Sequence, residues 1–316
     1  MSALIEGFPR GWFVVGWSSE LTDDNILNLN YFDQHQIAFR DENGELAIID
    51  AYCPHLGAHL GVGGCKVNGT VQCPFHAWRF DKTGQCVEIP YMKKKMPARA
   101  RVDKWPAVEK NGILFMWHHP HGAPPDYEVP EIEDFKSGAW SPWDENIITV
   151  KTHPREIIEN VADSAHFPIV HATNVTHFAN TFVGHKATQH TVGNAFPQGR
   201  LDEIDIFSTY HGPAFQISHM KGYLASILFL AHTPITTNEL HLRFAVSLES
   251  SGPKTDKFAK MYAANIRNGF HEDITIWETK TYREKPRLCD GDGPLGPLRK
   301  WYSQFYDNGE ETHVAS

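Results

Sequence analysis

The sequence contains Cys53-Pro54-His55 and, after a spacer of 17 residues, Cys73-Pro74-Phe75-His76. Each motif supplies one thiolate and one imidazole, and each lies between short segments that are predicted to be strands. Two predicted hairpin tips therefore present four metal ligands, two of them sulfur and two nitrogen. This pattern predicts a metal centre held by loops, and the surrounding strands predict a small β-sandwich or barrel.

Three interpretations fit these four residues. Structural zinc accepts two Cys and two His, but zinc sites more often pair Cys with Cys and His with His. A Rieske [2Fe–2S] cluster uses two His on one iron and two Cys on the other, and Cys-x-His followed by Cys-x-x-His is its pattern. In the third interpretation, the four residues have unrelated roles. The flanking stretches His55–Gly61 and Phe75–Phe80 favour the cluster, whereas Cys65 and Cys86 lack a paired His and are interpreted as core or surface thiols.

The first half of the chain, up to about His119, is rich in turns. Sequences such as Asp41-Glu42-Asn43-Gly44 separate short apolar runs, which indicates an all-β domain. The stretch His118–Pro130 is rich in Pro and Gly, and we interpret it as a linker. The predicted strands of this half are Trp12–Trp17, Gln36–Phe39, Leu46–Asp50, Thr70–Cys73, Ala77–Asp81 and Ile113–Trp117.

The second half mixes longer strands with helices. Leu240–Leu248 alternates apolar and polar residues, which is typical of a half-buried strand. Leu201–His219 and Tyr223–His232 are predicted to be neighbouring strands. The predicted helices are Arg155–Ala165, Asp256–Thr279 and Leu298–Tyr306.

A second candidate metal site lies in the segment Glu159–His171. His166 and His171 are five residues apart, and we expect Pro168 to break the helix between them so that both imidazoles face one point. Two imidazoles and one carboxylate form the facial triad of non-haem Fe(II) oxygenases. The alternative is two unrelated histidines, and the upstream cluster motif favours ligands. The remaining histidines considered are interpreted as structural: His153, His177, His185, His190, His211, His219 and His271.

The carboxylate is expected from the predicted helix Asp256–Thr279. Asp273 lies in its apolar stripe, four residues from both Gly269 and Trp277, where a charge needs a partner or a metal. Glu272 lies about 100° further round the helix. We therefore prefer Asp273 as the third ligand; the alternative is a buried salt bridge or an acid in a polar groove.

Asp163 precedes His166 by one helical turn, so both would share a helix face. As a neighbour of the ligand, Asp163 would orient His166 and connect it to the cluster; otherwise it is a surface acid. Asn160 lies one turn earlier and is predicted, more weakly, to point toward the iron. Both are candidate catalytic residues.

With both motifs present, the chain resembles the oxygenase components of Rieske non-haem iron oxygenases over nearly its whole length. Within that family it is similar to the steroid-acting branch, the 3-ketosteroid 9α-hydroxylases and cholesterol 7-desaturases. The stretches that carry the resemblance are Phe8-Pro9-Arg10-Gly11-Trp12, the two metal motifs, Ile89-Pro90-Tyr91, Gly112–His118, Glu272-Asp273-Ile274 and Arg299–Tyr306.

The resemblance implies an α+β fold, with an N-terminal all-β Rieske domain (residues 1–119) and a helix-grip-like catalytic domain with an antiparallel sheet (residues 120–316). It implies two cofactors, a [2Fe–2S] cluster and a mononuclear Fe(II). By matching position, the cluster ligands are Cys53, His55, Cys73 and His76. By the same matching, the iron ligands are His166, His171 and Asp273, and Asp163 is the bridging acid.

The resemblance also implies an activity: O2 activation and hydroxylation of a steroid-like apolar substrate. Electrons would come from NAD(P)H through a separate reductase and would cross between subunits of a head-to-tail homotrimer. A sterol desaturase, an aromatic-ring dioxygenase and an O-demethylase are the alternatives within the family. Candidate pocket residues, chosen by position, are Phe178, Phe182, Phe207, Tyr210, Phe215 and Phe229, although an aromatic residue on a strand is more often plain core.

Composition and charge restrict the function classes, partners and cellular locations that fit the sequence. A net charge of −9 argues against a nucleic-acid partner. The longest nearly apolar run is too short to span a membrane, and five cysteines in a chain of 316 residues indicate a reduced, cytoplasmic protein. The run Lys93-Lys94-Lys95 is either a docking site for an acidic reductase or a solvated loop. The rival classes are a Rieske electron carrier and a zinc-stapled binding module.

Overall fold

The computed structural model describes residues 7–195, 202–222, 225–249, 261–262, 264 and 271–306. These residues divide into two units. The first unit contains Trp12–His118 and Gly122–Glu131; the second contains Gly7–Gly11, His119–His121 and the described residues from Ile132 onward. None of the described helices is long and apolar enough to cross a membrane.

The first unit consists of three small sheets. A short 3₁₀ helix, η1, also occurs in it, at Ser18–Glu20. The first sheet has the order β1 (Gly11–Trp17), β11 (Ile113–His118), β10 (Ala107–Lys110). The second is β2 (Leu27–Tyr31), β3 (Gln34–Arg40), β4 (Leu46–Asp50), β9 (Lys104–Trp105). The third is β5 (Cys65–Val67), β6 (Thr70–Gln72), β7 (Arg79–Phe80), β8 (Cys86–Glu88). Strand pairing is antiparallel between β10 and β11 and throughout the second and third sheets.

The all-β prediction for this half is confirmed, and all six predicted strands occur within a few residues of their predicted bounds. The prediction missed β2, β5, β8, β9 and β10. Four of these have only two to four residues, too few for a period to register. β2 is different, because its alternation of Leu27, Leu29 and Tyr31 with Asn28 and Asn30 is a strand signal that we overlooked.

The predicted linker His118–Pro130 is not a free linker. Most of it packs on the first unit: Lys110 Nζ donates to Val129 O (3.0 Å), and Trp12 Nε1 donates to Tyr127 O (2.7 Å). Tyr127 and Val129 are buried. The prediction weighed the prolines and missed these apolar side chains, whose burial holds the segment in place.

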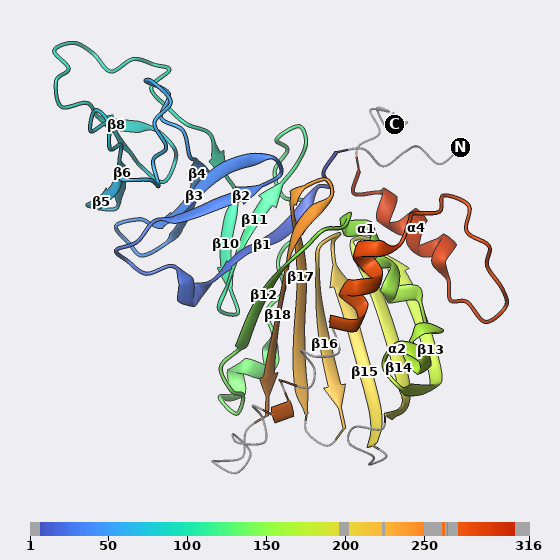
Figure 1. Cartoon of the computed structure of the whole chain (residues 1–316). Helices are drawn as coiled ribbons and strands as arrows, with labels where there is room; N and C mark the ends of the chain where they lie inside the picture. The colour runs from blue at the N-terminus through green and yellow to red at the C-terminus, as the bar shows by residue number, and fades with distance from the viewer. Residues whose placement is uncertain are drawn as a thin grey trace, which may run out of the picture. The chain divides into compact units, whose positions relative to one another are not determined.

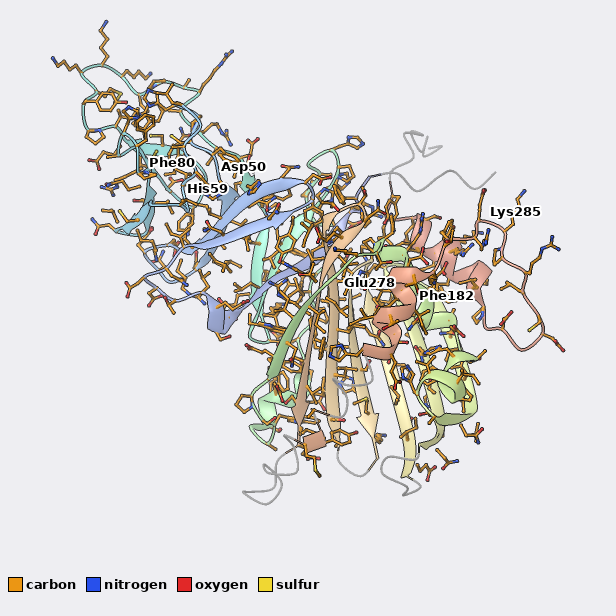
Figure 2. All side chains as sticks on the ribbon, in the orientation of Figure 1. Asp50, His59, Phe80, Phe182, Glu278 and Lys285 are labelled. Carbon is orange, nitrogen blue, oxygen red and sulfur yellow. The ribbon has the colours of Figure 1, made fainter. Side chains whose placement is uncertain are left out.

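The core of the first unit lies directly beneath the two cysteine motifs. Cys53 and Cys73 are buried in one apolar cluster with Leu60, Val71 and Phe80, and Phe80 is fully buried (Figure 2). Cys86 belongs to the same core, whereas Cys65 is exposed. Packing therefore anchors both ligand loops at their cysteine ends.

The second unit is built on a seven-stranded sheet whose neighbouring strands are all antiparallel (Figure 1). Its order is β12 (Asp144–Val150), β18 (Glu239–Leu248), β17 (Ser226–Thr236), β16 (Phe215–Lys221), β15 (Asp202–His211), β14 (Lys186–Ala195), β13 (Thr173–Val183). The helical segments are η2 (Glu133–Ser137), α1 (Pro154–Ile158), η3 (Glu159–Ala162), α2 (His166–Val170), a helix over residues 271–279, and α4 (Leu295–Ser303). In Figure 1, α1, α2 and α4 lie over one face of the sheet. This arrangement confirms the predicted α+β class.

Several predicted bounds in this half were wrong. Leu201–His219 is two strands, β15 and β16, because Gly212 takes a left-handed conformation (φ +74°) that turns the chain back. β18 is buried on both faces, not on one. The last helix begins at Leu295, before its predicted start. Within the predicted helix Asp256–Thr279, residues 271–279 are helical, and most of the remainder lies outside the described residues.

Candidate active site and metal centres

The two cysteine motifs fold into turns of the same geometry. Gly57 N donates to Cys53 O (2.9 Å), and Ala77 N donates to Cys73 O (3.1 Å), each four residues after its cysteine. Both donor residues have a left-handed conformation, with φ of +76° at Gly57 and +58° at Ala77. The two loops therefore present their Cys and His side chains in matched fashion, which suits a ligand held from two sides.

The side chains of these loops form one group. The imidazole rings of His55 and His76 lie 4.6 Å apart, and His55 stacks on Trp78 at 4.7 Å. Trp78 Nε1 donates to Tyr91 OH (2.7 Å), which fixes that indole. His55 Nδ1 is buried and has no hydrogen-bond partner among the described residues. An imidazole with a buried, unpaired nitrogen is suited to a metal or to a neighbouring acceptor.

The electrostatics of the cysteines lead to the same conclusion. Burial, together with the adjacent Cys73, raises the pKa of the Cys53 thiol to about 11. A buried thiol of this kind ionises more readily when a cation compensates its charge. Two sulfur and two nitrogen donors in matched loops fit a [2Fe–2S] cluster of the Rieske type.

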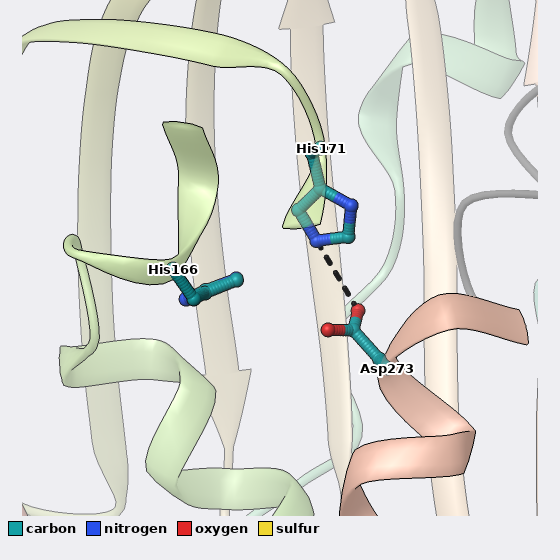
Figure 3. Close-up of side chains that lie close together, drawn as sticks. All are labelled: His166, His171 and Asp273. Carbon is teal, nitrogen blue, oxygen red and sulfur yellow. Dashed lines mark ion pairs between the residues drawn. The ribbon is translucent and has the colours of Figure 1, made fainter. Parts of the chain in front are cut away.

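The second group gathers His166, His171 and Asp273 (Figure 3). One ligand atom from each lies within 4.8 Å of the others. His171 Nε2 is 3.3 Å from Asp273 Oδ2, and the two imidazole rings are 5.2 Å apart. Asp273 is only 7% exposed, so its charge needs compensation. Two imidazoles and one carboxylate at this spacing can hold a metal on one side and leave its other positions open.

The role expected of Pro168 was wrong. α2 runs from His166 through Pro168 to Val170, and Pro168 does not interrupt it. Pro168 is the third residue of the helix, where its missing N–H would have had no partner within the helix. The histidines converge because α2 is a single short turn: His166 opens it and His171 caps it.

Each histidine of this group faces an acid with its other nitrogen. His166 Nδ1 is 3.5 Å from Asp163 Oδ2, and His171 Nδ1 is 3.8 Å from Glu272 Oε2. Burial lowers the pKa of His171, but the hydrogen bond that His171 donates to Asp273 and the charges of Asp273 and Glu272 raise it more, so the net shift is upward. Each Nδ1 thus has a carboxylate nearby, and the Nε2 atoms are the ones left for a metal. Glu272 was considered only as a rival ligand, and its place beside His171 could not be read from helix spacing.

The sequence predicted that Asp163 and His166 lie on one helix, but they do not. η3 ends at Ala162, and Asp163 is extended (φ −99°, ψ 107°). Its Oδ1 accepts hydrogen bonds from Ala165 N (3.0 Å) and His166 N (3.3 Å), a capping arrangement that competes with helix continuation. The hydrogen bond with His166 lowers the pKa of Asp163, so it is charged at neutral pH. Its side chain is 46% exposed, which leaves an edge open to a partner.

A cavity of about 230 Å³ opens onto this group. Alternation along the strands decides its lining: on β15, Ile206, Ser208 and Tyr210 face it, whereas Phe207 faces away. Of the six aromatic candidates, only Tyr210 lines the cavity; Phe215 and Phe229 are buried on the opposite face. The apolar lining is Ile157, Val161, Phe167, Ile206, Met220, Leu228, Leu230 and Trp277.

The cavity also has a polar patch that the sequence analysis missed. Gln189, Ser208, Gln216 and Ser218 line it together. Ser208 Oγ and Ser218 Oγ are 2.8 Å apart, and Gln216 Nε2 donates to Ser218 Oγ (3.0 Å). Gln216 and Ser218 at alternate positions of one strand were the available signal. Among the described lining residues there is no Lys or Arg.

Comparison with known proteins defines the class. Residues 11–107 match the Rieske [2Fe-2S] domain, and residues 116–306 match the 3-Ketosteroid 9alpha-hydroxylase C-terminal domain. A Rieske domain followed by this second domain defines an oxygenase component. The solved structure of dicamba monooxygenase bound to dicamba has the same fold, with a TM-score of 0.79 at 20% identity, over 95% of this chain and 98% of that one.

Two curated relatives then give the family. The chain is 36% identical to a 3-ketosteroid-9-alpha-monooxygenase oxygenase component of Rhodococcus rhodochrous, over 95% of this chain and 83% of the relative. It is 32% identical to the cholesterol 7-desaturase of Caenorhabditis elegans, over 95% and 77%. The chain belongs to the Rieske oxygenase family that contains the 3-ketosteroid 9α-monooxygenase oxygenase components. The predicted family and the predicted cofactors, a [2Fe–2S] cluster and a mononuclear iron, are thereby confirmed.

Proposed function

We propose that the protein hydroxylates a C–H bond of a neutral, steroid-like substrate, using O2 and electrons delivered by a separate reductase. The observation that carries the proposal is the apolar cavity that ends at His166, His171 and Asp273. The similarity to 3-ketosteroid-9-alpha-monooxygenases over 95% of the chain supports the substrate class.

The chemistry of the cavity favours a neutral molecule. An aromatic acid would bring a carboxylate, and the described lining residues include no Lys or Arg to pair with it. A ketone or hydroxyl group instead finds hydrogen-bond partners in Gln189 and Gln216, whose side chains line the cavity. The remaining walls are apolar and exclude water from the rest of the substrate.

We assign the metals to the residues that the geometry brings together. Cys53, His55, Cys73 and His76 would hold the cluster, and His166, His171 and Asp273 the mononuclear iron. When bound, these groups supply stored electrons and O2 activation. The charges of Asp163 and Glu272 lie 3.5 Å and 3.8 Å from Nδ1 of His166 and His171, and such acids would favour the orientation that turns each Nε2 toward the metal. Met220, Leu228 and Leu230 exclude water and place the substrate beside these ligands.

A desaturase is the second candidate, because a cholesterol 7-desaturase is 32% identical over 95% of the chain. Both reactions begin at an unactivated C–H bond in an apolar pocket, and the same ligands serve both. The two differ in product: hydroxylation adds one oxygen, whereas desaturation removes two hydrogens.

A single turnover tests both candidates without the reductase. The purified protein is reduced chemically, the reductant is removed, and a 3-ketosteroid and O2 are added. A product heavier by one oxygen in the mass spectrum supports hydroxylation, and a product lighter by two hydrogens supports desaturation. Protein that holds both metals but converts neither 3-ketosteroids nor sterols would contradict the proposed substrate class.

The reductase is proposed to dock beside the cluster. Lys93, Lys94 and Lys95 are exposed, and the loop 91–101 that carries them also contains Arg99 and Arg101 and no acid. Tyr91, at its start, lies 6.3 Å from the His76 ring. In a chain of net charge −9, this loop is a local positive surface suited to an acidic electron donor.

Reversal of all three lysines to glutamate tests this docking. We expect the association rate with the reductase to fall at least about tenfold at low salt and to lose its salt dependence, because rim charges act mainly on encounter. Stopped-flow reduction of the cluster at several ionic strengths measures this rate. The matched control is reversal of Lys285 and Lys300, which lie in the second unit. An unchanged salt dependence in the triple variant would contradict the docking site.

We also propose a head-to-tail trimer in the cytoplasm. Ile169 is 85% exposed within α2, the half-exposed Asp163 precedes that helix, and Leu56 and Phe75 are exposed on the cluster loops. Such apolar side chains beside both metal sites suit contact between chains, with Asp163 as the connection. All five cysteines are unpaired, which suits a reducing compartment. Light scattering of the purified protein measures the oligomeric state.

A further inference from the structure

Asn160 and Trp277 join the two segments that carry the proposed iron ligands. Asn160 lies on η3, six residues before His166, and Trp277 lies one helical turn after Asp273. Trp277 Nε1 donates a hydrogen bond to Asn160 Oδ1 (3.2 Å). Both side chains line the cavity. The Asn160 oxygen therefore faces an indole N–H, which differs from its expected orientation toward the iron.

Trp277 itself is held firmly. Its side chain is buried against Val150, Ile157 and Ile274, and its backbone oxygen accepts from Thr152 Oγ1 (2.9 Å). The indole is thus a fixed point on the ligand helix, and its N–H is the polar group near Asp273 that reaches η3. Further along, Lys280 pairs with acids of α1 and η3, but at the end of the helix away from Asp273.

We propose that Asn160 is a positioning residue that acts through Trp277. Their hydrogen bond fixes the helix of Asp273 relative to the segment of His166 and His171. The ligands come from segments about 100 residues apart in the sequence, so a connection between those segments determines how closely the carboxylate approaches the two imidazoles. This proposal rests on the ligand set assigned above, and it does not depend on the identity of the substrate.

A double-mutant cycle tests the proposal. Asn160→Ala removes the acceptor, and Trp277→Phe removes the donor while keeping an aromatic ring in the core. We expect each variant to weaken Fe(II) binding about tenfold, which is the usual effect of losing a group that orients a ligand. Both should alter the EPR spectrum of the iron nitrosyl complex in the same way. Because both remove one bond, the double variant should resemble either single variant.

Two results would overturn the positioning role of Asn160. If Asn160→Ala alters iron binding or the nitrosyl spectrum and Trp277→Phe does not, Asn160 acts directly on the iron and the proposal is overturned. Additive effects in the double variant overturn it as well. Glu278→Ala is the control, because Glu278 is exposed on the same helix and bonds only Lys151 N among its known contacts (2.9 Å); it should leave the iron unchanged.

Further measurements distinguish a failure of the positioning role from a failure of the proposed substrate or of the assigned ligand set. Cluster absorbance and circular dichroism report whether each variant is folded. Iron affinity and the nitrosyl spectrum need no steroid, so wild-type protein that binds iron normally but converts no steroid would refute only the substrate. Retention of iron by Asp273→Ala would instead refute the ligand set, and this positioning proposal with it.

Discussion

Asp273→Ala is expected to remove the mononuclear iron and leave the cluster intact. The iron content should fall from about three to about two atoms per chain, and turnover should fall by more than about 100-fold. The physical reason is that Asp273 is the one carboxylate within 4.8 Å of the ligand atoms of both His166 and His171 in the described part of the chain. Its loss leaves two neutral imidazoles, which bind a dication weakly. Metal analysis together with the visible absorbance of the cluster measures both centres.

The neighbouring acid provides a matched control. Glu272→Gln changes a charge on the same helix, 3.8 Å from the other nitrogen of His171, and Gln keeps an oxygen that can accept the Nδ1–H. This variant should keep its iron. A full iron complement in Asp273→Ala, or loss of iron in Glu272→Gln alone, would show that the ligand set is wrong.

Asp163→Asn is expected to keep both metals and to lower turnover about 100-fold, the upper range for a group that orients a metal ligand. Asp163 Oδ1 accepts hydrogen bonds from Ala165 N and His166 N, and its Oδ2 lies 3.5 Å from His166 Nδ1. Asparagine has a single oxygen, so it can accept the backbone bonds or the imidazole N–H, but not both. It also lacks the charge that, in the proposed trimer, would meet a histidine of the neighbouring chain. Stopped-flow reoxidation of the reduced cluster, with substrate and O2 present, measures the rate of electron transfer from the cluster to the mononuclear iron.

Asp205 gives the control for this second variant. Asp205 Oδ1 is 2.9 Å from His190 Nε2, and Asp205 is exposed to a similar degree as Asp163, but neither residue of this pair lines the cavity. Asp205→Asn should therefore leave turnover unchanged. Normal transfer in Asp163→Asn, with both metals bound, would remove Asp163 from the path between the centres.

The cluster motifs were readable from the sequence because each is local. A Cys and a His two or three residues apart lie in one turn wherever the chain folds, and their residue types suffice to predict iron or zinc. The same holds for His166 and His171, which one short helix brings together. Even here the prediction of Pro168 as a helix breaker was wrong, because the effect of proline depends on its position within the helix.

For Asp163, local spacing predicted the contact with His166 but not the backbone structure that produces it. Spacing of three residues predicted a shared helix face, and the two side chains do meet. They meet because Asp163 caps the start of α2 and ends the preceding helix, which depends on hydrogen-bond competition at one residue. The orientation of Asn160 toward Trp277 depends on a contact over 117 residues, and nothing in the local sequence indicates it.

Residues close together in the chain carry ligand chemistry and strand periodicity. The family, the all-β first half, the sheet-rich second half and the candidate metal ligands could therefore be predicted from the sequence. Only the tertiary structure decided which side chains line the cavity, that Glu272 faces His171 and that Asn160 bonds Trp277. These depend on strand register and on the approach of distant segments. A shift of one residue along β15 would exchange Phe207 for Ser208 in the cavity, because a one-residue slip turns every side chain of a strand to the other face of the sheet.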